Sequence, residues 1–458
     1  MRAITRRNLG LSATRALRCT SAPVGIGGLA VKFIFPDSLD LVDPNYDFIA
    51  DQPAADRQRH WDERYPHELM DPVPYDGVLV SRGIVGDHRF PGKYSAPQMM
   101  RFRRDGARRF LRLDGPRFEH MPIFGDSGAF SYVKEQVPPY TSAQMLEFYA
   151  DAGFTHGCSV DHIIFDYDGE EKGPVVGSES ARQRSEITLE NAGEFLKLSS
   201  ALGPDFTPIG VAQGWSPSSL AGAAAQLEKM GYSYVALGGL VPLRAPEIHR
   251  CLAAVRERVA PGTKIHLLGF AKAESIDEFA RYGIESFDST SPLLRAFKDA
   301  NANYYVLTRE GLEYYAAIRI PRALENTRLV RATKEGKFRQ EALLDLERKA
   351  LDAVRGYSHQ QVGLEEAVEA VAYYGSLLAD DPAEGSASRE KLRNSIRSAT
   401  RRTLIDRPWA ECACEICKSA SVEVVIFRGS GRNKRRGFHN LGVFFQHVRR
   451  LLGKELSG

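Results

Sequence analysis

Three cysteines crowd into six positions near the C-terminus, as Cys412-Ala-Cys414-Glu-Ile-Cys417. Thiolates at this density, together with a fourth soft or imidazole ligand, are typical of a tetrahedral zinc site. Two histidines follow, His439 and His447, and either could supply the imidazole. A site closed by four protein ligands would be structural and not catalytic. A reduced cysteine cluster without metal is the alternative, which is disfavoured because neighbouring free thiols oxidise readily.

A second set of chemically capable residues follows short apolar runs upstream of the cysteines. Taken alone, each aspartate in this set could be a helix N-cap. Together the residues offer carboxylates for acid–base or nucleophilic chemistry, and an amide and glycines that can approach the edge of a flat ligand. The set comprises Asp126-Ser127-Gly128, Asp161-His162, Gln213-Gly214, Gly238-Gly239, Gly269 and Asp288-Ser289.

The elements that must position these residues alternate between strands and helices. Such alternation predicts a parallel sheet. Seven strands between residues 77 and 287 favour an α/β fold of the (β/α)8 TIM-barrel type, with an open doubly wound sheet as the alternative. The polar residues would then lie at the C-terminal ends of the strands, where barrel enzymes carry their catalytic groups. Strands are expected at 77–81, 122–125, 157–160, 207–212, 234–237, 264–268 and 284–287, and helices at 142–152, 185–202, 216–230, 246–259 and 275–282.

The remainder of the chain divides by composition. Residues 1–30 form a basic tail that we expect to be disordered, with a targeting segment as the alternative. The barrel domain is expected over 31–300. A mostly helical region follows over 301–405, and a zinc-binding subdomain with a closing helix over 406–458.

Charge is distributed unevenly along the 458 residues. Residues 389–454 hold 16 Lys and Arg against 5 Asp and Glu, although the whole chain carries only three net positive charges. This asymmetry favours a polyanionic partner over a merely solvated basic surface. The segment 427–436 is predicted to be a loop over phosphates, and its nucleic-acid-binding candidates are Arg432, Lys434, Arg435 and Arg436.

Two classes of protein are disfavoured by composition. No run of about 18 apolar residues occurs, so we expect no membrane-spanning helix. Of the six cysteines, three are clustered and three are scattered, which is a poor disulfide framework and indicates a reducing, cytoplasmic compartment.

Five motifs, in this order, resemble the tRNA-guanine transglycosylase superfamily. They are Asp126-Ser-Gly-Ala-Phe130, Gly210-Val-Ala-Gln213-Gly214, Leu237-Gly-Gly-Leu240, Gly283-Ile-Glu-Ser-Phe-Asp288, and the cysteine cluster followed by His439-Asn-Leu441. Three further segments resemble the DpdA-type branch, which inserts the 7-deazaguanine base preQ0 into DNA. They are Lys32-Phe-Ile-Phe-Pro-Asp37, Pro74-Tyr-Asp-Gly77 and Phe287-Asp-Ser-Thr-Ser-Pro292.

The resemblance implies a pentosyltransferase that exchanges guanine in DNA for preQ0 through a covalent aspartyl–sugar intermediate. It implies that Asp288 is the nucleophile and Asp126 the general acid/base, and that His439 is the fourth ligand of a structural Zn²⁺. It also implies substrate-binding roles for Ser127, Asp161, Gln213, Gly239 and Leu240. Asp166 and Asp168 follow Asp161 closely and are alternatives for its role.

Departures from the tRNA enzymes sharpen this expectation. Asp288 is followed by Ser-Thr-Ser-Pro in place of the segment that contacts RNA in those enzymes. Arg244 replaces an acidic residue that suits a cationic base, which favours the neutral base preQ0. We interpret the long helical region as an insertion that binds DNA or another protein of a DNA-modification system.

Two other functions remain as alternatives for the whole chain. They are a transglycosylase acting on tRNA and a catalytically silent, zinc-containing nucleic-acid-binding subunit.

Overall fold

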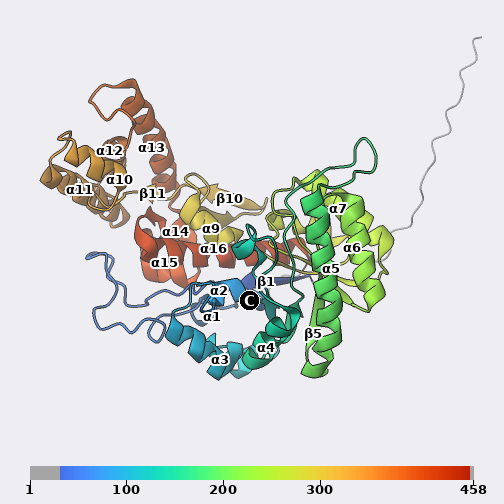
Figure 1. Cartoon of the computed structure of the whole chain (residues 1–458). Helices are drawn as coiled ribbons and strands as arrows, with labels where there is room; N and C mark the ends of the chain where they lie inside the picture. Colours follow the sequence, from blue (N-terminus) through green and yellow to red (C-terminus); the bar gives the residue numbers. More distant parts are fainter. Residues whose placement is uncertain (1–30, 454–458) are drawn as a thin grey trace, which may run out of the picture.

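The computed structural model describes residues 31–453, and eight parallel strands form a closed barrel at its centre (Figure 1). The ring closes where β1 pairs with β8, with Ile34 opposite Asp288. Closure confirms the TIM barrel and excludes the open sheet. The expectation for residues 1–30 lies outside the described residues. The strands are β1 Lys32–Pro36, β2 Gly77–Ser81, β3 Ile123–Asp126, β4 His156–Cys158, β5 Thr207–Ala212, β6 Tyr234–Leu237, β7 Lys264–Leu267 and β8 Ile284–Asp288.

The seven predicted strands correspond to β2–β8, and β1 was not among them. Asp288 therefore ends the eighth strand of the barrel, although it follows the seventh of the predicted strands. The strands are short and almost wholly buried, as expected where helices cover the outer face of a parallel sheet.

Helices connect the strands and begin and end at recognisable caps. Thr141 accepts a hydrogen bond from the amide of Gln144 at the start of α4, and Gly153 ends that helix in the left-handed region. Ser216 caps α6 in the same way. The helices of this half are α1 Pro66–Leu69, α2 Arg82–Val85, α3 Ala96–Phe110, α4 Ser142–Ala152, α5 Glu179–Ser199, α6 Pro217–Met230, α7 Ala245–Arg258, α8 Ile276–Ala280 and α9 Ser291–Lys298.

The region after α9 begins with a hairpin, so the mostly helical stretch starts with strands. Four helices, α10–α13, then form a lobe on the opposite side of the molecule from α5–α7 (Figure 1). No helix among residues 31–453 is both long and apolar enough to cross a membrane. The elements are β9 Tyr304–Leu307, β10 Leu312–Tyr315, β11 Ile318–Arg319, α10 Thr327–Lys334, α11 Gln340–Ser358, α12 Leu364–Ser376, α13 Ala387–Asp406, α14 Pro408–Glu411, α15 Glu415–Ala420, β12 Ile426–Phe427 and α16 Gly429–Leu451.

Helix α16 joins the C-terminal region to the barrel. Its Phe444 ring lies 5.2 Å from the ring of Phe33 on β1, in an edge-on contact. Gly437 lies so close to Leu293 of α9 that a Cβ atom would approach the leucine side chain to 2.6 Å. The Asn440 amide donates hydrogen bonds to the carbonyls of Pro292 and Asn303. Burial of α16 against β1 and α9 therefore supports the strands that close the barrel.

The structure corrects the expected phosphate-binding loop. Most of 427–436 forms the first turns of α16, and the four arginines of this segment are buried. Arg432 is 1% exposed and pairs with Asp51 and Glu423. Arg436 is fully buried and donates to carbonyls, and burial lowers its pKa to about 9. Arg435 donates to the carbonyl of Asp43.

Lys434 is half-buried, and its ammonium lies 3.5 Å from the carbonyl of Leu39. Other basic residues of the region are also paired within the protein. Arg428 binds Glu347, and Arg397 binds Glu369 at 2.5 Å. The C-terminal excess of positive charge is therefore neutralised largely by acids from other parts of the chain, and the four predicted residues do not form an exposed basic face.

Asp51 is the centre of this ionic network. Although burial opposes ionisation, a hydrogen bond from Arg322 and the charges of Arg432 and Arg428 hold the pKa of Asp51 well below its usual range. We predict that Asp51→Ala lowers the free energy of unfolding by about 3–5 kcal/mol, because it leaves buried arginines without a counter-charge. Glu335→Ala breaks exposed pairs with Arg331 and Lys337 and should lower the free energy of unfolding far less than Asp51→Ala does. Urea unfolding of both variants checks this, and equal losses would contradict it.

Candidate active site and metal centre

A cavity of about 450 Å³ opens at the C-terminal end of the barrel. Its size is within the range of small-molecule sites, and charged and apolar groups both line it. The predicted residues Asp126, Asp161, Gln213, Gly239 and Asp288 all line the cavity. Predicted positions Ser127 and Leu240 do not line it but are buried beside it, at 0% and 2% exposure.

Asp161 is held by two side-chain donors. The amide of Gln213 donates to one carboxylate oxygen at 2.7 Å, and the hydroxyl of Ser127 donates to the other at 3.1 Å. Burial raises the pKa of Asp161 to about 6, and these two hydrogen bonds oppose the rise. Of the three aspartates considered for this role, only Asp161 lines the cavity; Asp166 and Asp168 are exposed on the following loop.

Asp126 has a more strongly raised pKa. One oxygen accepts a hydrogen bond from the backbone amide of Gly128 at 3.0 Å. Burial, followed by the charges of Asp161 and Asp288, raises its pKa to about 7. A carboxyl group with a pKa near neutrality can both donate and accept a proton under cellular conditions, which is the requirement for a general acid/base.

Asp288, at the end of β8, receives two hydrogen bonds on the same oxygen. The backbone amide of Gly269 donates to Oδ1 at 2.9 Å, and the His266 ring nitrogen Nε2 lies 3.2 Å from that atom. Within residues 31–453, Oδ2 has no hydrogen-bond partner. The carboxylate is therefore fixed through one oxygen, while the other is free to react.

Two adjacent glycines shape the floor of the cavity. A Cβ atom on Gly238 would lie 2.1 Å from the Gln213 amide nitrogen. Gly239 has φ of +73°, and its Cβ would meet the carbonyl of Ile164 at 2.9 Å. A side chain at position 238 would displace Gln213, which orients Asp161, and one at position 239 would collide with the backbone of Ile164.

The three clustered cysteines and His439 converge on one point. All four ligand atoms lie within 4.8 Å of one another. His439 Nδ1 is 3.5 Å from the sulfurs of Cys412 and Cys414 and 3.3 Å from that of Cys417. Metal–ligand bonds of about 2.3 Å to sulfur and 2.0–2.1 Å to nitrogen, in tetrahedral geometry, require a separation close to these values. The cluster can therefore hold a metal ion.

Surrounding groups orient the histidine for metal binding. His439 Nε2 lies 2.8 Å from the carbonyl of Tyr305, which leaves Nδ1 as the ligand atom. The Tyr304 ring stacks on the imidazole with centroids 4.1 Å apart, and its hydroxyl lies 3.1 Å from the Cys417 sulfur. His447, the other histidine considered, instead contacts the carbonyl of Glu274 at 2.9 Å.

Comparison with known proteins identifies the family. A protein named DNA-guanine transglycosylase, from Salmonella montevideo, is 41% identical over 421 residues, which are 91% of this chain and 96% of that protein. The chain belongs to the DNA-guanine transglycosylase family. This confirms the resemblance to the tRNA-guanine transglycosylase superfamily and to its DNA-modifying branch. No general family model matches the chain.

Asp37, which lines the cavity, and His266, which is buried beneath it, were not predicted as site residues. Asp37, at the end of β1, accepts a hydrogen bond from Tyr94 at 3.0 Å. Burial and the charge of Asp40 raise the pKa of Asp37 to about 6. A strand at 32–36 could have revealed this residue, because it would put Asp37 on the same edge as the other aspartates. His266 lies within β7 and not after it, so a search of strand ends passes over it.

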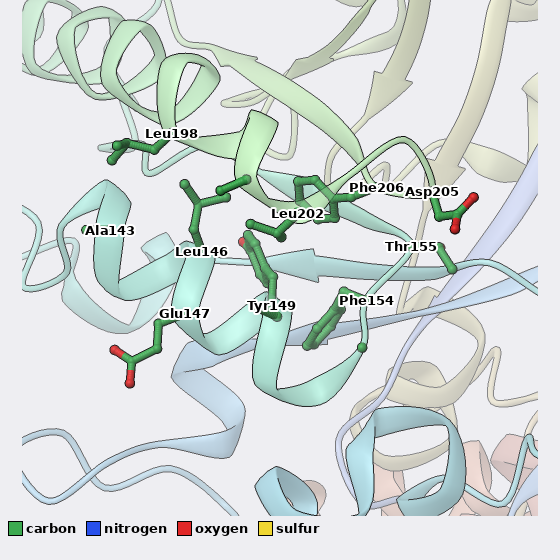
Figure 2. A pocket seen from close by; sticks show the side chains of 13 residues that line it. Ala143, Leu146, Glu147, Tyr149, Phe154, Thr155, Leu198, Leu202, Asp205 and Phe206 are labelled. Atoms are coloured by element: carbon green, nitrogen blue, oxygen red, sulfur yellow. The ribbon is translucent and has the colours of Figure 1, made fainter.

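A second hollow, of about 730 Å³, lies outside the barrel (Figure 2). Leu146 and Tyr149 of α4, together with Leu202 and Phe206, give it a mainly apolar wall. The carboxylates of Glu147 and Asp205 lie on opposite sides of it and point apart in Figure 2. Its lining includes residues that precede β4 and β5, at the end of the barrel opposite the aspartates. This larger hollow has no convergent reactive groups.

The raised pKa of Asp126 predicts a pH-dependent stability. Protonation of this carboxyl group favours the folded state below its unfolded pKa of 3.8, and the advantage is lost as pH rises to about 7. Asn at this position is neutral throughout. Asp126→Asn should therefore stabilise the protein more at pH 8 than at pH 5. The difference should be about 1.4 kcal/mol for each pH unit between 5 and the folded-state pKa of about 7.

Urea unfolding at the two pH values measures this difference. Asp168→Asn, on the exposed loop, is the matched control and should show no such gain. A pH-independent effect of Asp126→Asn would show that Asp126 is ionised in the folded protein across this range.

Proposed function

We propose that this protein is a base-exchange transglycosylase that replaces guanine in DNA with preQ0 through a covalent intermediate on Asp288. Guanine exchange in DNA is supported by similarity to the Salmonella DNA-guanine transglycosylase over most of both chains. The observation that carries the mechanism is the convergence of Asp126, Asp161 and Asp288 on one cavity.

Two displacements at the sugar carbon C1′ account for the exchange. Asp288 Oδ2 attacks C1′, the bond from C1′ to guanine N9 breaks, and Asp126 protonates the departing base. After preQ0 replaces guanine, the Asp126 carboxylate removes the proton from N9 of preQ0. That nitrogen then attacks C1′ and releases the Asp288 carboxylate. No water or redox step is required.

The remaining polar groups suit a guanine-like edge. Asp161 accepts from Gln213 and Ser127, yet each carboxylate oxygen has a second lone pair that can accept from the N1–H and 2-amino groups of the base. Gln213, with Gly239 and the backbone at Leu240, is proposed to bind the 6-oxo group. Adenine presents the opposite donors and acceptors and would leave Asp161 unpaired.

The preference for preQ0 over a cationic base rests on the segment after β6. It contributes Gly238, Gly239 and Val241 to the cavity lining, and none of these has an acidic side chain that could neutralise a cationic aminomethyl group. Arg244 does not line the cavity; it is an exposed residue that binds Glu247 at the start of α7. A neutral nitrile needs no counter-charge at this position.

Exposed aromatic rings near the cavity suit a nucleic-acid substrate. Phe130, which lines the cavity, and Phe165 are 59% and 45% exposed, with ring centroids 6.0 Å apart. Base–aromatic stacking stabilises unpaired nucleotides by about 1–3 kcal/mol per base. A target base within a duplex would have to be flipped out to reach Asp288.

The other parts of the chain have proposed supporting roles. Residues 31–300 carry the chemistry, and residues 406–458 bind structural Zn²⁺ through the Cys3His cluster. The insertion, 301–405, contacts DNA or another protein of a DNA-modification system. We propose a cytoplasmic location because the clustered thiols and the free Cys158 and Cys251 require reducing conditions.

Asp288→Asn tests the proposed nucleophile. It should abolish guanine exchange while leaving DNA affinity almost unchanged, because an amide has a similar shape but is a poor nucleophile. Mass spectrometry of nucleosides from DNA and tRNA incubated with protein and preQ0 measures the product. Modified tRNA without modified DNA would favour the tRNA alternative. Turnover by Asp288→Asn near the wild-type rate would exclude Asp288 as the nucleophile.

The proposed zinc ligands predict different behaviour for the two C-terminal histidines. His439→Ala should lose the metal and lower the thermal midpoint, because three thiolates remain without their fourth ligand. His447→Ala, on the same helix, should retain one equivalent of zinc. Metal analysis of the purified proteins measures this. Zinc retained by His439→Ala and lost by His447→Ala would contradict the ligand assignment.

A further inference from the structure

Beneath Asp288, polar side chains from three adjacent strands extend through the barrel interior. Tyr234, His266 and Ser286 lie on β6, β7 and β8 and are between 0% and 2% exposed. Their surroundings include the apolar side chains of Ile34 and Phe124. Unpaired polar groups are costly in such an interior, so their hydrogen bonds must be nearly complete.

The three residues form one chain of hydrogen bonds that ends at Asp288. The Tyr234 hydroxyl lies 2.5 Å from the Ser286 hydroxyl, which lies 2.5 Å from His266 Nδ1. His266 Nε2 lies 3.2 Å from Asp288 Oδ1. An ionised carboxylate can only accept, so Nε2 carries the proton. With a neutral imidazole, Nδ1 accepts from Ser286 and Ser286 accepts from Tyr234, which satisfies every group in the chain.

We propose that His266 is a positioning residue for the reaction, held by Ser286 and Tyr234. Together with the amide of Gly269 it binds Asp288 Oδ1 and turns Oδ2 toward the substrate. This inference rests on the proposed role of Asp288. When Oδ2 bonds to C1′, Oδ1 becomes the ester carbonyl oxygen, and the same two donors remain on it. They then stabilise the carboxylate that is released when preQ0 attacks C1′.

The hydrogen bonds of its two ring nitrogens distinguish His266 from a buried histidine that only fills space. Tyr234 and Ser286 satisfy Nδ1 and determine the tautomer. The remaining donor, Nε2–H, points to the one carboxylate oxygen that is not available for attack. Removing that donor should misplace the nucleophile, because Oδ1 would then be held only by the backbone amide of Gly269.

Two amide substitutions separate the two ends of the imidazole. The Gln side-chain nitrogen in His266→Gln can reach the position of Nε2, whereas the Asn nitrogen in His266→Asn reaches only that of Nδ1. His266→Gln should form the covalent DNA adduct within about 10-fold of the wild-type rate. His266→Asn should be slowed about 100-fold, with unchanged DNA affinity, because a small misplacement of a reacting group costs about this much.

Tyr234→Phe provides a variant that preserves shape. It removes only the hydroxyl that supports Ser286, and it should slow adduct formation several-fold without changing DNA affinity. Single-turnover formation of the adduct, resolved on denaturing gels, measures all three variants, and thermal midpoints report folding. Equal rates for His266→Asn and His266→Gln, or a wild-type rate for Tyr234→Phe, would overturn the inference.

The outcome is separable from that of the proposed function. Peptide mapping of the wild-type adduct identifies the residue that bears the sugar. An adduct on another residue would exclude Asp288 as the nucleophile, whatever the variants do. An adduct on Asp288 that forms at the wild-type rate in His266→Asn would leave the proposed function intact and remove His266 from it.

Discussion

Burial of several carboxylates in one cavity is the constraint on which the catalytic end of the barrel depends. Asp37, Asp126, Asp161 and Asp288 all line the same space of about 450 Å³. Burial and mutual repulsion both disfavour four negative charges there, so the proton distribution is set by the donors that each carboxylate receives. Asp288 and Asp161 each receive two hydrogen bonds from well-placed donors. Asp126 receives only backbone donors and has a pKa raised to about 7. Asp126, whose buried charge is least stabilised by hydrogen-bond donors, is thus the carboxyl group suited to release and take up a proton near neutral pH.

In the C-terminal region, buried positive charges are likewise stabilised by the groups that surround them. Arg428 and Arg432 are buried because Asp51, Glu347 and Glu423 surround them. Asp51, on the loop after β1, and Glu347, on the insertion, are distant in the sequence, whereas Glu423 lies just before β12. The ionic network therefore joins three segments of the chain, together with the pairing of β11 with β12. Loss of one acid should be felt in all three, since each arginine contacts more than one of them.

Features that depend on local sequence patterns could be predicted, whereas those that depend on contacts between distant residues could not. Strands β2–β8 were recognisable because parallel strands buried on both faces are short apolar runs. β1 was missed because its run follows the basic tail, and the next helix, α1, is only four residues long. The cysteine ligands are local and were found by spacing, whereas His439 needed the family motif because it is distant in sequence. Arg432 and Arg435 of α16 were wrongly predicted to bind phosphates, because the sequence shows that they are charged but not that their partners come from residues 43–51 and 423. His266 was missed because its function depends on a neighbouring strand.

Helix α16 connects the Cys3His cluster to the strands β1 and β8, which close the barrel beside Asp288. Its first turns are held by Asp51 and Glu423, and its middle by the Cys3His cluster and by Asn440. Its later turns place Phe444 against Phe33 of β1. β1 pairs with β8 at Asp288, and Phe33 also stacks on Phe287, the residue before the proposed nucleophile. The Cys3His cluster, which could hold a metal ion, thus includes a residue of the helix that packs on the strand pair closing the barrel. The position of Asp288 depends on this packing from outside the barrel and on His266 from within it.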